Sequence, residues 1–257
     1  MTSLDSKVAL ITGGSRGVGR ALALALASRR CSVAINHRDS AAQAEETVRF
    51  VEESGGRAIC VRGDTANDDD CRRMIAVTAE RFGRLDILVN NAATTEFIPY
   101  AEMEKLTTEL WDRIFAVNVR GPFQCVRAAR DLLQATGAGH VINISSIAGL
   151  DGSGSSIPYA ASKAALINMT QSLARTLAPS VQVNSIAPGF IDSQWTHEGL
   201  GTSYAAISEI HKTRAAMQAI CRPEDVADAV MSLLEGSRLV TGQTLVCDAG
   251  AMIAARS

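Results

Sequence analysis

Short runs of β-branched and aliphatic residues alternate with longer stretches of helical periodicity along most of the chain. The runs are apolar through their middles, which is typical of strands that are buried on both faces of a parallel sheet. Seven such runs predict strands at residues 7–12, 31–36, 57–63, 85–90, 140–145, 181–186 and 243–248.

The segments between these strands have the spacing of amphipathic helices. One face of the first helix carries Val18, Leu22, Ala25 and Leu26. The second helix is predicted to begin after Ser40, a good N-cap residue, and to end at the glycines 55–56. Strand, helix and strand repeated in this way predict right-handed crossovers and one parallel sheet with helices on both faces.

No change of composition and no Pro/Ser-rich linker divides the 257 residues, so we predict a single domain over 1–257. The segment 190–218, between the sixth and seventh strands, is long and contains two glycines. It is predicted to be a partly mobile insertion over the sheet. Its larger side chains either line an apolar pocket or only cover the sheet, and the pattern does not distinguish the two; they are Trp195, Leu200, Tyr204 and Ile207.

Composition narrows the classes of function. A hydrophobic content of 47% with 20% charged residues is typical of a globular protein with a substantial core. The net charge of −2, without a basic run, argues against nucleic acid or an anionic membrane as a partner. No apolar run has the length of a membrane span, and Met1 stands too close to the first strand for a signal peptide. We therefore expect a cytoplasmic protein.

The six cysteines and four histidines are dispersed, with no C-x-x-C pair. In an intracellular chain this pattern predicts free thiols and no metal site.

A glycine-rich turn, TGGSRGVG at 12–19, joins the first strand to the first helix. Its glycines allow a tight turn, a close backbone approach to a pyrophosphate and close packing of the helix, whose N-terminus then faces the phosphates. A glycine-rich turn alone is weak evidence, but this position between strand and helix predicts a dinucleotide site.

The glycine spacing is G-x-x-x-G-x-G, and it is followed in order by NNA at 90–92, Asn118, NISS at 143–146, Y-x-x-x-K at 159–163 and PG at 188–189. With these motifs the chain, from about residue 7 to 250, resembles the short-chain dehydrogenase/reductase family, most of all its 3-oxoacyl-acyl-carrier-protein reductase branch. The resemblance implies an α/β fold, a Rossmann-type doubly wound sheet of about seven parallel strands. It also implies hydride transfer between NADP(H) and a carbonyl or acyl-thioester substrate, in a homotetramer.

Three positions depart from the family pattern. Ala93 and the segment DAG at 248–250 stand where glycines are common, and Ser193 stands where threonine is common. Ala93 bears on how closely the ribose approaches its turn. Ser193 keeps the hydroxyl that the resemblance assigns to the nicotinamide amide.

Tyr159 and Lys163 are four residues apart, so they share one face of a helix. An ammonium one turn away is expected to lower the pKa of the phenol from about 10, toward the range of a general acid near neutrality. By resemblance Lys163 also holds the ribose hydroxyls of the nicotinamide half.

The remaining catalytic assignments come from the motifs around this pair. Ser146 is expected to bond the substrate oxygen, and it is preferred over Ser145 because neighbours at a strand end point to opposite sides. Asn118 is a poor residue for the middle of a helix. In the family this asparagine interrupts the helix and anchors a water that relays protons.

The second strand ends in INHRDS, and this end bears on cofactor choice. An NAD-binding protein of this kind would have an acid there to hold the adenosine 2′-hydroxyl. Asn36 and His37 occupy those positions, and Arg38 and Arg16 offer the planar guanidinium groups that suit a 2′-phosphate. NADP(H) is therefore favoured, although both arginines could instead be solvent-exposed loop residues.

By resemblance Asp64 bonds the adenine amine, although it could equally be a turn residue. The cofactor-binding set expected from the family pattern is completed by Tyr159 and Lys163 with Gly13, Ser15, Gly17, Val18, Gly19, Thr65, Asn91, Ala92, Pro188, Gly189, Ile191 and Ser193.

Two other functions remain open at the level of sequence. One is a nucleotide-binding sensor without turnover, against which the intact Ser146, Tyr159 and Lys163 argue. The other is an NAD(P)-dependent sugar or steroid alcohol dehydrogenase on the same fold, for which cofactor preference is the discriminating measurement. The sequence does not indicate the physiological substrate.

Overall fold

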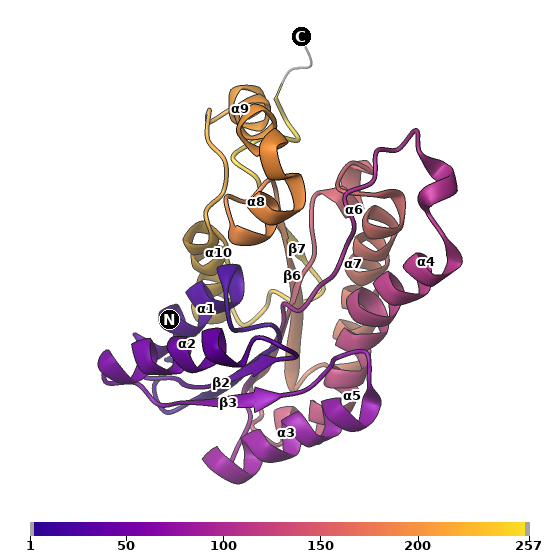
Figure 1. Cartoon of the computed structure of the whole chain (residues 1–257). Helices are drawn as coiled ribbons and strands as arrows, with labels where there is room; N and C mark the ends of the chain where they lie inside the picture. Colours follow the sequence, from indigo (N-terminus) through magenta and orange to yellow (C-terminus); the bar gives the residue numbers. More distant parts are fainter. Residues whose placement is uncertain (1–2, 255–257) are drawn as a thin grey trace.

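The computed structural model of the chain describes residues 3–254, arranged around a seven-stranded parallel sheet (Figure 1). The strand order is β3-β2-β1-β4-β5-β6-β7. All seven predicted strands are confirmed, with ends that differ by at most two residues: β1 (Val8–Ile11), β2 (Ser32–His37), β3 (Ala58–Arg62), β4 (Ile87–Asn90), β5 (Gly139–Ile144), β6 (Val181–Pro188) and β7 (Thr244–Cys247).

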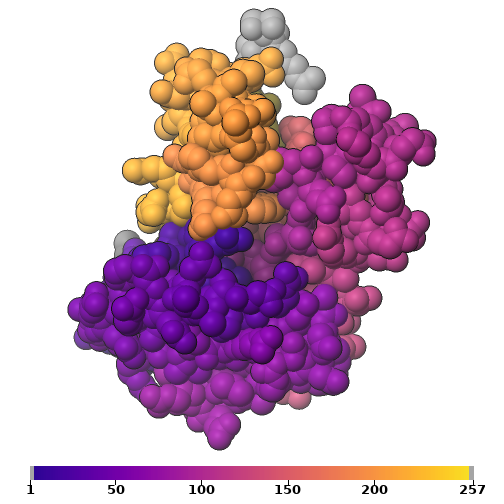
Figure 2. Space-filling model, in the orientation of Figure 1, coloured from indigo at the N-terminus to yellow at the C-terminus, as the bar shows by residue number. Residues whose placement is uncertain are grey.

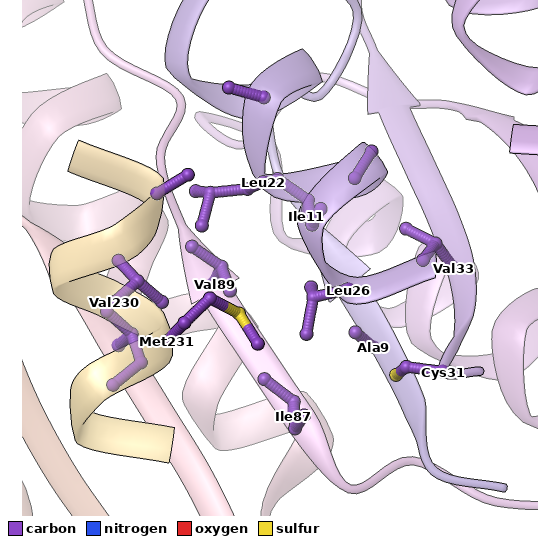
Figure 3. Close-up of a cluster of buried hydrophobic side chains, with 14 of the residues drawn as sticks. Ala9, Ile11, Leu22, Leu26, Cys31, Val33, Ile87, Val89, Val230 and Met231 are labelled. Carbon is purple, nitrogen blue, oxygen red and sulfur yellow. The ribbon is translucent and has the colours of Figure 1, made fainter. Parts of the chain in front are cut away.

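Helices cover both faces of the sheet, as predicted. One face packs against α1 (Gly17–Ala27), α2 (Ala41–Glu53) and α10 (Pro223–Glu235). The other packs against α3 (Asp68–Phe82), α5 (Gly121–Ala135) and α7 (Ile157–Leu177). Figure 3 shows the first layer, where Leu22 and Leu26 of α1 meet Val230 and Met231 of α10 over the buried strands β1 and β4. Each large aliphatic side chain buried here contributes about 1.5–3 kcal/mol relative to an exposed one.

The order of the strands determines where a ligand can bind. From β1 the chain continues through β2 and β3 toward one edge of the sheet. It then returns to β4, which lies beside β1, and continues through β5, β6 and β7 toward the other edge. The strand order therefore reverses between β1 and β4. In open α/β sheets ligands bind outside the carboxyl ends of the strands at such a switch point. The glycine-rich turn follows β1 at this place.

The predicted start of α2 is confirmed, but Ser40 does not cap it in the expected manner. Ser40 is the N-cap residue, yet its hydroxyl makes no capping hydrogen bond. Instead its Oγ lies 2.7 Å from Oγ of Ser15 in the glycine-rich turn. The residue therefore ties the start of α2 to the predicted phosphate site.

The long helical pattern around Asn118 is not one regular helix. It begins as α4 (Thr108–Phe115), passes through a π-helical turn, η2 (Ala116–Arg120), and continues as α5. Asn118 is the central residue of the π turn and is fully buried. Single π turns inside α-helices are frequent at functional sites because they displace one side chain from the regular ladder.

The segment 190–218 forms two helices, α8 (Gln194–Leu200) and α9 (Tyr204–Arg214), joined by a 3₁₀ turn, η3 (Gly201–Ser203). In Figure 1 this orange segment stands beyond the ends of β6 and β7, across from the loop that precedes α4. That loop contains the 3₁₀ turn η1 (Met103–Lys105), and the short helix α6 (Ala148–Asp151) follows β5. Between residues 3 and 254, no helix combines the length and apolar character needed to cross a membrane.

Candidate active site

A cavity of about 930 Å³ lies at the carboxyl ends of the strands. It runs from the glycine-rich turn and the end of β2, past β4 and β5, to the inner side of α8 and α9. Figure 2 shows the hollow between the orange segment of α8 and α9 and the magenta segment that precedes α4. The cavity is therefore long enough to accommodate a dinucleotide at one end and a substrate at the other.

The glycine-rich turn has the geometry of a phosphate cradle. Gly13 and Gly17 adopt φ of +61° and +53°, a backbone conformation that other residues rarely adopt. No atom lies within 4 Å of the place where a Cβ of Gly17 would stand, so the turn is open on that side. The side chain of Asn91 donates to the carbonyl oxygens of Thr12 and Gly13, at 3.0 and 2.9 Å, and fixes the turn. A pyrophosphate fits this cradle.

Gly19 was predicted to bind the cofactor, but it is not one of the described residues that line the cavity. A Cβ at this position would lie 2.2 Å from the carbonyl oxygen of Gly13. Gly19 is therefore required for close packing of α1 against the turn, as its position in the motif also indicated.

Tyr159 and Ser146 face the same end of the cavity from different elements. Tyr159 lies in the first turns of α7, and Ser146 follows β5. The neighbouring hydroxyl of Ser145 is buried and donates to the carbonyl oxygen of Ile186 at 2.7 Å. Ser146 instead accepts a hydrogen bond from the amide of Ala148 and keeps its own proton to donate.

The predicted lowering of the Tyr159 pKa by Lys163 is not found. Burial raises the pKa of the phenol to about 12, and the hydroxyl of Ser146 acts in the opposite direction. The amine of Lys163 lies 5.6 Å from the centre of the phenol ring, over its face, and donates to the carbonyl oxygen of Ile144 at 2.9 Å. Because the amine is directed at that carbonyl, Ser146 is the group that favours the phenolate.

Lys163 is itself perturbed by its surroundings. Its side chain is buried in the wall of the cavity, and burial lowers the pKa of the ammonium to about 8. A buried ammonium is costly unless it is paired, so an additional acceptor from a ligand would stabilise it. The ribose hydroxyls assigned to this lysine by resemblance are acceptors of that kind.

Asn118 lies behind the cavity wall and not in it. Its Oδ1 accepts from the amide of Thr94 at 2.8 Å, and its Nδ2 donates to the carbonyl oxygen of Thr94 and to Oγ of Ser162, both at 3.0 Å. Thr94 does line the cavity. The π turn thus connects the loop after β4 to the helix that carries Tyr159 and Lys163.

The two arginines predicted to hold a 2′-phosphate both line the cavity, Arg16 from the glycine-rich turn before α1 and Arg38 from the position after β2. Each already has an acidic partner. Nε of Arg38 donates to the carboxylate of Asp39 at 2.6 Å, and Nη1 of Arg16 to that of Glu198 in α8 at 3.3 Å. Both pairs are largely exposed to solvent, where such pairs contribute about 0–1 kcal/mol, so a phosphate could replace either partner.

Asp64 and Ser193 have local partners as well as places in the cavity wall. Oδ1 of Asp64 accepts from the amide of Ala66 at 2.9 Å, which makes Asp64 a turn residue. Ser193 is the N-cap of α8 and forms a capping box with Thr196. Neither arrangement uses every acceptor of the side chain.

The other residues predicted to bind cofactor are brought together along the same wall. Those that line the cavity are Gly13, Ser15, Gly17, Val18, Thr65, Asn91, Ala92, Pro188, Gly189 and Ile191.

Aromatic side chains close the substrate end of the cavity. The ring of Trp195 in α8 meets Tyr159 edge to face with 6.1 Å between centroids, and it meets Phe97 at 6.4 Å. Phe97 comes from the irregular loop after β4 and was not predicted, because that loop has no periodicity.

Leu200 and Ile207 also line the cavity, so the pocket interpretation holds for them. Tyr204 does not; it donates to Asp192 and stacks on His197.

The six cysteines are all free, as predicted. Between residues 3 and 254, no group of three or more His, Cys, Asp or Glu side chains could hold a metal ion.

Comparison with known proteins identifies the family. Residues 13–252 match a family model described as enoyl-(acyl carrier protein) reductase. The chain belongs to the short-chain dehydrogenase/reductase family. Membership in this oxidoreductase family agrees with the resemblance on which the site assignments were based.

Relatives of this short-chain dehydrogenase/reductase match it over nearly its whole length. It is 40% identical to a protein proposed as ketoacyl reductase 2 of the granaticin polyketide synthase of Streptomyces violaceoruber, over 96% of each chain. It is 36% identical to a 3-oxoacyl-[acyl-carrier-protein] reductase of Synechocystis, over 97% of this chain and 98% of the relative. A crystal structure from Burkholderia xenovorans, proposed to be a short-chain dehydrogenase/reductase, superposes with a TM-score of 0.89 at 34% identity, over 96% of this chain and 98% of that one.

Proposed function

We propose that the protein is an NADPH-dependent reductase of a 3-oxoacyl thioester or a related ketone. The observation that carries the proposal is one continuous cavity that joins the phosphate cradle to Ser146, Tyr159 and Lys163. The names of the 3-oxoacyl and ketoacyl reductases to which the chain is similar support the same substrate class.

The chain's own residues divide the chemistry among them. NADPH, when bound, supplies the hydride that reduces the carbonyl carbon. The hydroxyl of Ser146 donates to the carbonyl oxygen as negative charge develops there. Tyr159 then gives its phenolic proton to that oxygen, and Ser146 stabilises the phenolate that remains. Lys163, whose amine already donates to the carbonyl oxygen of Ile144, holds the cofactor ribose.

The aromatic side chains that close the substrate end of the cavity assist this reaction by excluding water. Trp195 and Phe97 present apolar ring surface beside the phenol, which suits an acyl chain or a ring adjacent to the ketone. Exclusion of water also strengthens the hydrogen bonds that form to the developing oxyanion.

The preference for NADP(H) within this proposal rests on Arg16 in the glycine-rich turn and on Arg38 after β2, which both line the cavity. Asp39, which lies in the same wall, supports a second candidate, an NAD-dependent alcohol dehydrogenase of the same fold. A carboxylate there could hold the 2′-hydroxyl of NAD. A homotetramer stays a prediction from the resemblance, and a cytoplasmic location stays a prediction from the sequence.

The test is oxidation of NADPH or NADH against a panel of acetoacetyl thioesters, quinones, keto sugars and ketosteroids. We expect turnover with NADPH and a 3-oxoacyl thioester, and a smaller kcat/KM with NADH. Oxidation of sugar or steroid alcohols with NAD would instead support the dehydrogenase. Tight NADPH binding without turnover on any ketone would favour the nucleotide-binding sensor.

A further inference from the structure

Asn36 is the last but one residue of β2 and pairs in register with Val61 of β3. Only 2% of the residue is exposed, although it lies in the cavity wall. Its side-chain amide is therefore almost wholly surrounded by protein. A buried amide is costly unless its oxygen has a donor and its nitrogen has acceptors.

The two oxygens of Asn36 hold the glycine-rich turn. Oδ1 accepts from the amide of Gly13 at 3.1 Å, and the backbone carbonyl oxygen of Asn36 accepts from the amide of Gly14 at 2.8 Å. Gly13 lines the cavity at the predicted pyrophosphate site. Two hydrogen bonds to one residue thus fix the first half of the turn relative to β2.

The side-chain nitrogen of the same residue holds the end of β3. Nδ2 lies 2.9 Å from the carbonyl oxygen of Gly63 and 3.2 Å from that of Val61, with the sulfur of Met74 in α3 at 2.8 Å. Gly63 lines the cavity beside Asp64 and Thr65, at the place that the resemblance gives to the adenine. A Cβ on Gly63 would lie 2.6 Å from the Met74 sulfur, so only glycine fits here.

We infer that Asn36 is a positioning residue for the cofactor, an inference that rests on the proposed binding of NADP(H) in this cavity. Its amide joins two walls of the cavity, the glycine-rich turn and the segment 63–65, and keeps them at a fixed separation. One cofactor can then contact the first wall with its pyrophosphate and the second with its adenosine. The side chain acts through these backbone groups, because its own polar atoms are already engaged by protein. Supporting hydrogen bonds of this kind keep a binding site in its productive geometry.

The same contacts give a structural reason for the lack of an acid at position 36. A carboxylate could accept from Gly13, but it has no hydrogen to donate and would face the carbonyl oxygens of Val61 and Gly63. An apolar side chain would leave the buried Gly13 amide without this acceptor, which is costly. An amide serves both walls at once. The requirement for asparagine here is therefore independent of the choice between NADP(H) and NAD(H).

The test is the dissociation constant of the full-length enzyme for NADPH and for NADH, measured by fluorescence titration in the wild type and in Asn36→Ala. We expect both constants to rise about tenfold, the factor that corresponds to one lost hydrogen bond, because both cofactors contain the adenosine and the pyrophosphate. The kcat at saturating cofactor should stay within about twofold of the wild type, since only binding is weakened. A loss confined to NADPH would show direct contact with the 2′-phosphate and would overturn the inference.

Asn184→Ala is the matched control for loss of a buried amide. Asn184 lies in β6 and is also 2% exposed. Its amide donates to the carbonyl oxygen of Val240 at 2.8 Å and accepts from the amide of Gln243 at 3.0 Å, but it is not one of the described residues that line the cavity. This variant should lose thermal stability, as Asn36→Ala does, and keep both dissociation constants unchanged. An equal rise of these constants in the two variants would contradict a positioning role, because loss of stability would then explain it.

If Asn36→Ala does not fold, amide hydrogen exchange of the wild type decides. The Gly13 amide should exchange slowly in the free enzyme as well as with NADPH bound, because its acceptor is the side chain of Asn36. Fast exchange of this amide in the free enzyme would rule out the positioning contact. Failure of the wild type to bind either NADPH or NADH is a distinguishable result, since it would overturn the proposed function and the inference with it.

Discussion

The indole ring of Trp195 lies edge to face against the phenol ring of Tyr159, with 6.1 Å between centroids and 63° between the ring planes. The first residue belongs to α8 of the insertion and the second to α7. The insertion therefore contributes directly to the burial that raises the pKa of Tyr159. The position of the insertion and the pKa of the Tyr159 phenol are therefore coupled through this contact between the two rings.

Trp195→Ala is expected to weaken use of an apolar ketone without affecting the cofactor. An aromatic pair contributes about 0.5–1.5 kcal/mol beyond its buried area, and about 1.4 kcal/mol corresponds to tenfold. We expect kcat/KM for an acetoacetyl thioester to fall about tenfold. The dissociation constant of NADPH should stay unchanged, and Trp195→Phe should restore most of the loss. A parallel loss of NADPH affinity would show that Trp195 supports the whole cavity instead.

Tyr159→Phe is expected to abolish turnover while NADPH affinity remains nearly intact. The phenol is the only proton donor assigned to the carbonyl oxygen besides Ser146, whose hydroxyl is needed to stabilise the phenolate. Loss of a positioned general acid costs about 10²–10⁴-fold in rate. Single-turnover reduction with prebound NADPH measures this step. A variant that keeps more than about a tenth of the wild-type rate would contradict the assignment.

The pH dependence of kcat/KM for NADPH should follow the ionisation of Lys163. Burial disfavours its ammonium and lowers its pKa to about 8, so the charged form is present below this pH and is lost as pH rises through it. Because kcat/KM reports groups of the free enzyme, its value for NADPH should fall above about pH 8. Lys163→Met should remove this limb and weaken both cofactor affinity and rate. A wild-type profile that is flat between pH 7 and 9 would leave the lysine without this role.

The sheet could be predicted almost completely because strands buried on both faces have a simple apolar signature. The glycine-rich turn was equally predictable, since Gly13 and Gly17 have backbone conformations with positive φ that other residues rarely adopt. Strand alternation predicted Ser146 over Ser145 as the hydroxyl offered to a ligand. Both residues line the cavity, but the hydroxyl of Ser145 donates to the carbonyl oxygen of Ile186. These features depend on local geometry, which the order of residues determines.

The rest depends on contacts between distant segments. Burial raises the pKa of Tyr159, and Lys163, one helical turn away, does not lower it. The reason is that the amine of Lys163 donates to the carbonyl oxygen of Ile144 in β5. Phe97 reaches Trp195 only through the fold, and a Cβ on Gly199 would lie 2.0 Å from the Phe97 ring. The contacts of the Asn36 side chain with Gly13 and Gly63 are likewise a property of the packed structure and not of the motif.

Cofactor choice can be tested at Arg38 and Asp39, which form an exposed ion pair at 2.6 Å beside the cavity. If Arg38 binds the 2′-phosphate, Arg38→Ala removes a hydrogen bond to a charged group, worth about 1.5–3 kcal/mol. The KM for NADPH should then rise roughly ten- to a hundredfold. NADH makes no such contact, so its kcat/KM should change little.

Asp39→Asn gives the opposite prediction and serves as the matched variant. The carboxylate holds Arg38 in the free enzyme and would repel a phosphate, so its removal should favour NADPH. Exposed pairs contribute up to about 1 kcal/mol, which corresponds to about a fivefold gain in kcat/KM for NADPH. Measurement of both cofactors in the wild type and both variants at fixed salt compares the effects directly. If Asp39 instead holds the 2′-hydroxyl of NADH, Asp39→Asn lowers kcat/KM for NADH, and the wild type prefers NADH; that pair of results would replace the NADPH-dependent reductase with the NAD-dependent dehydrogenase.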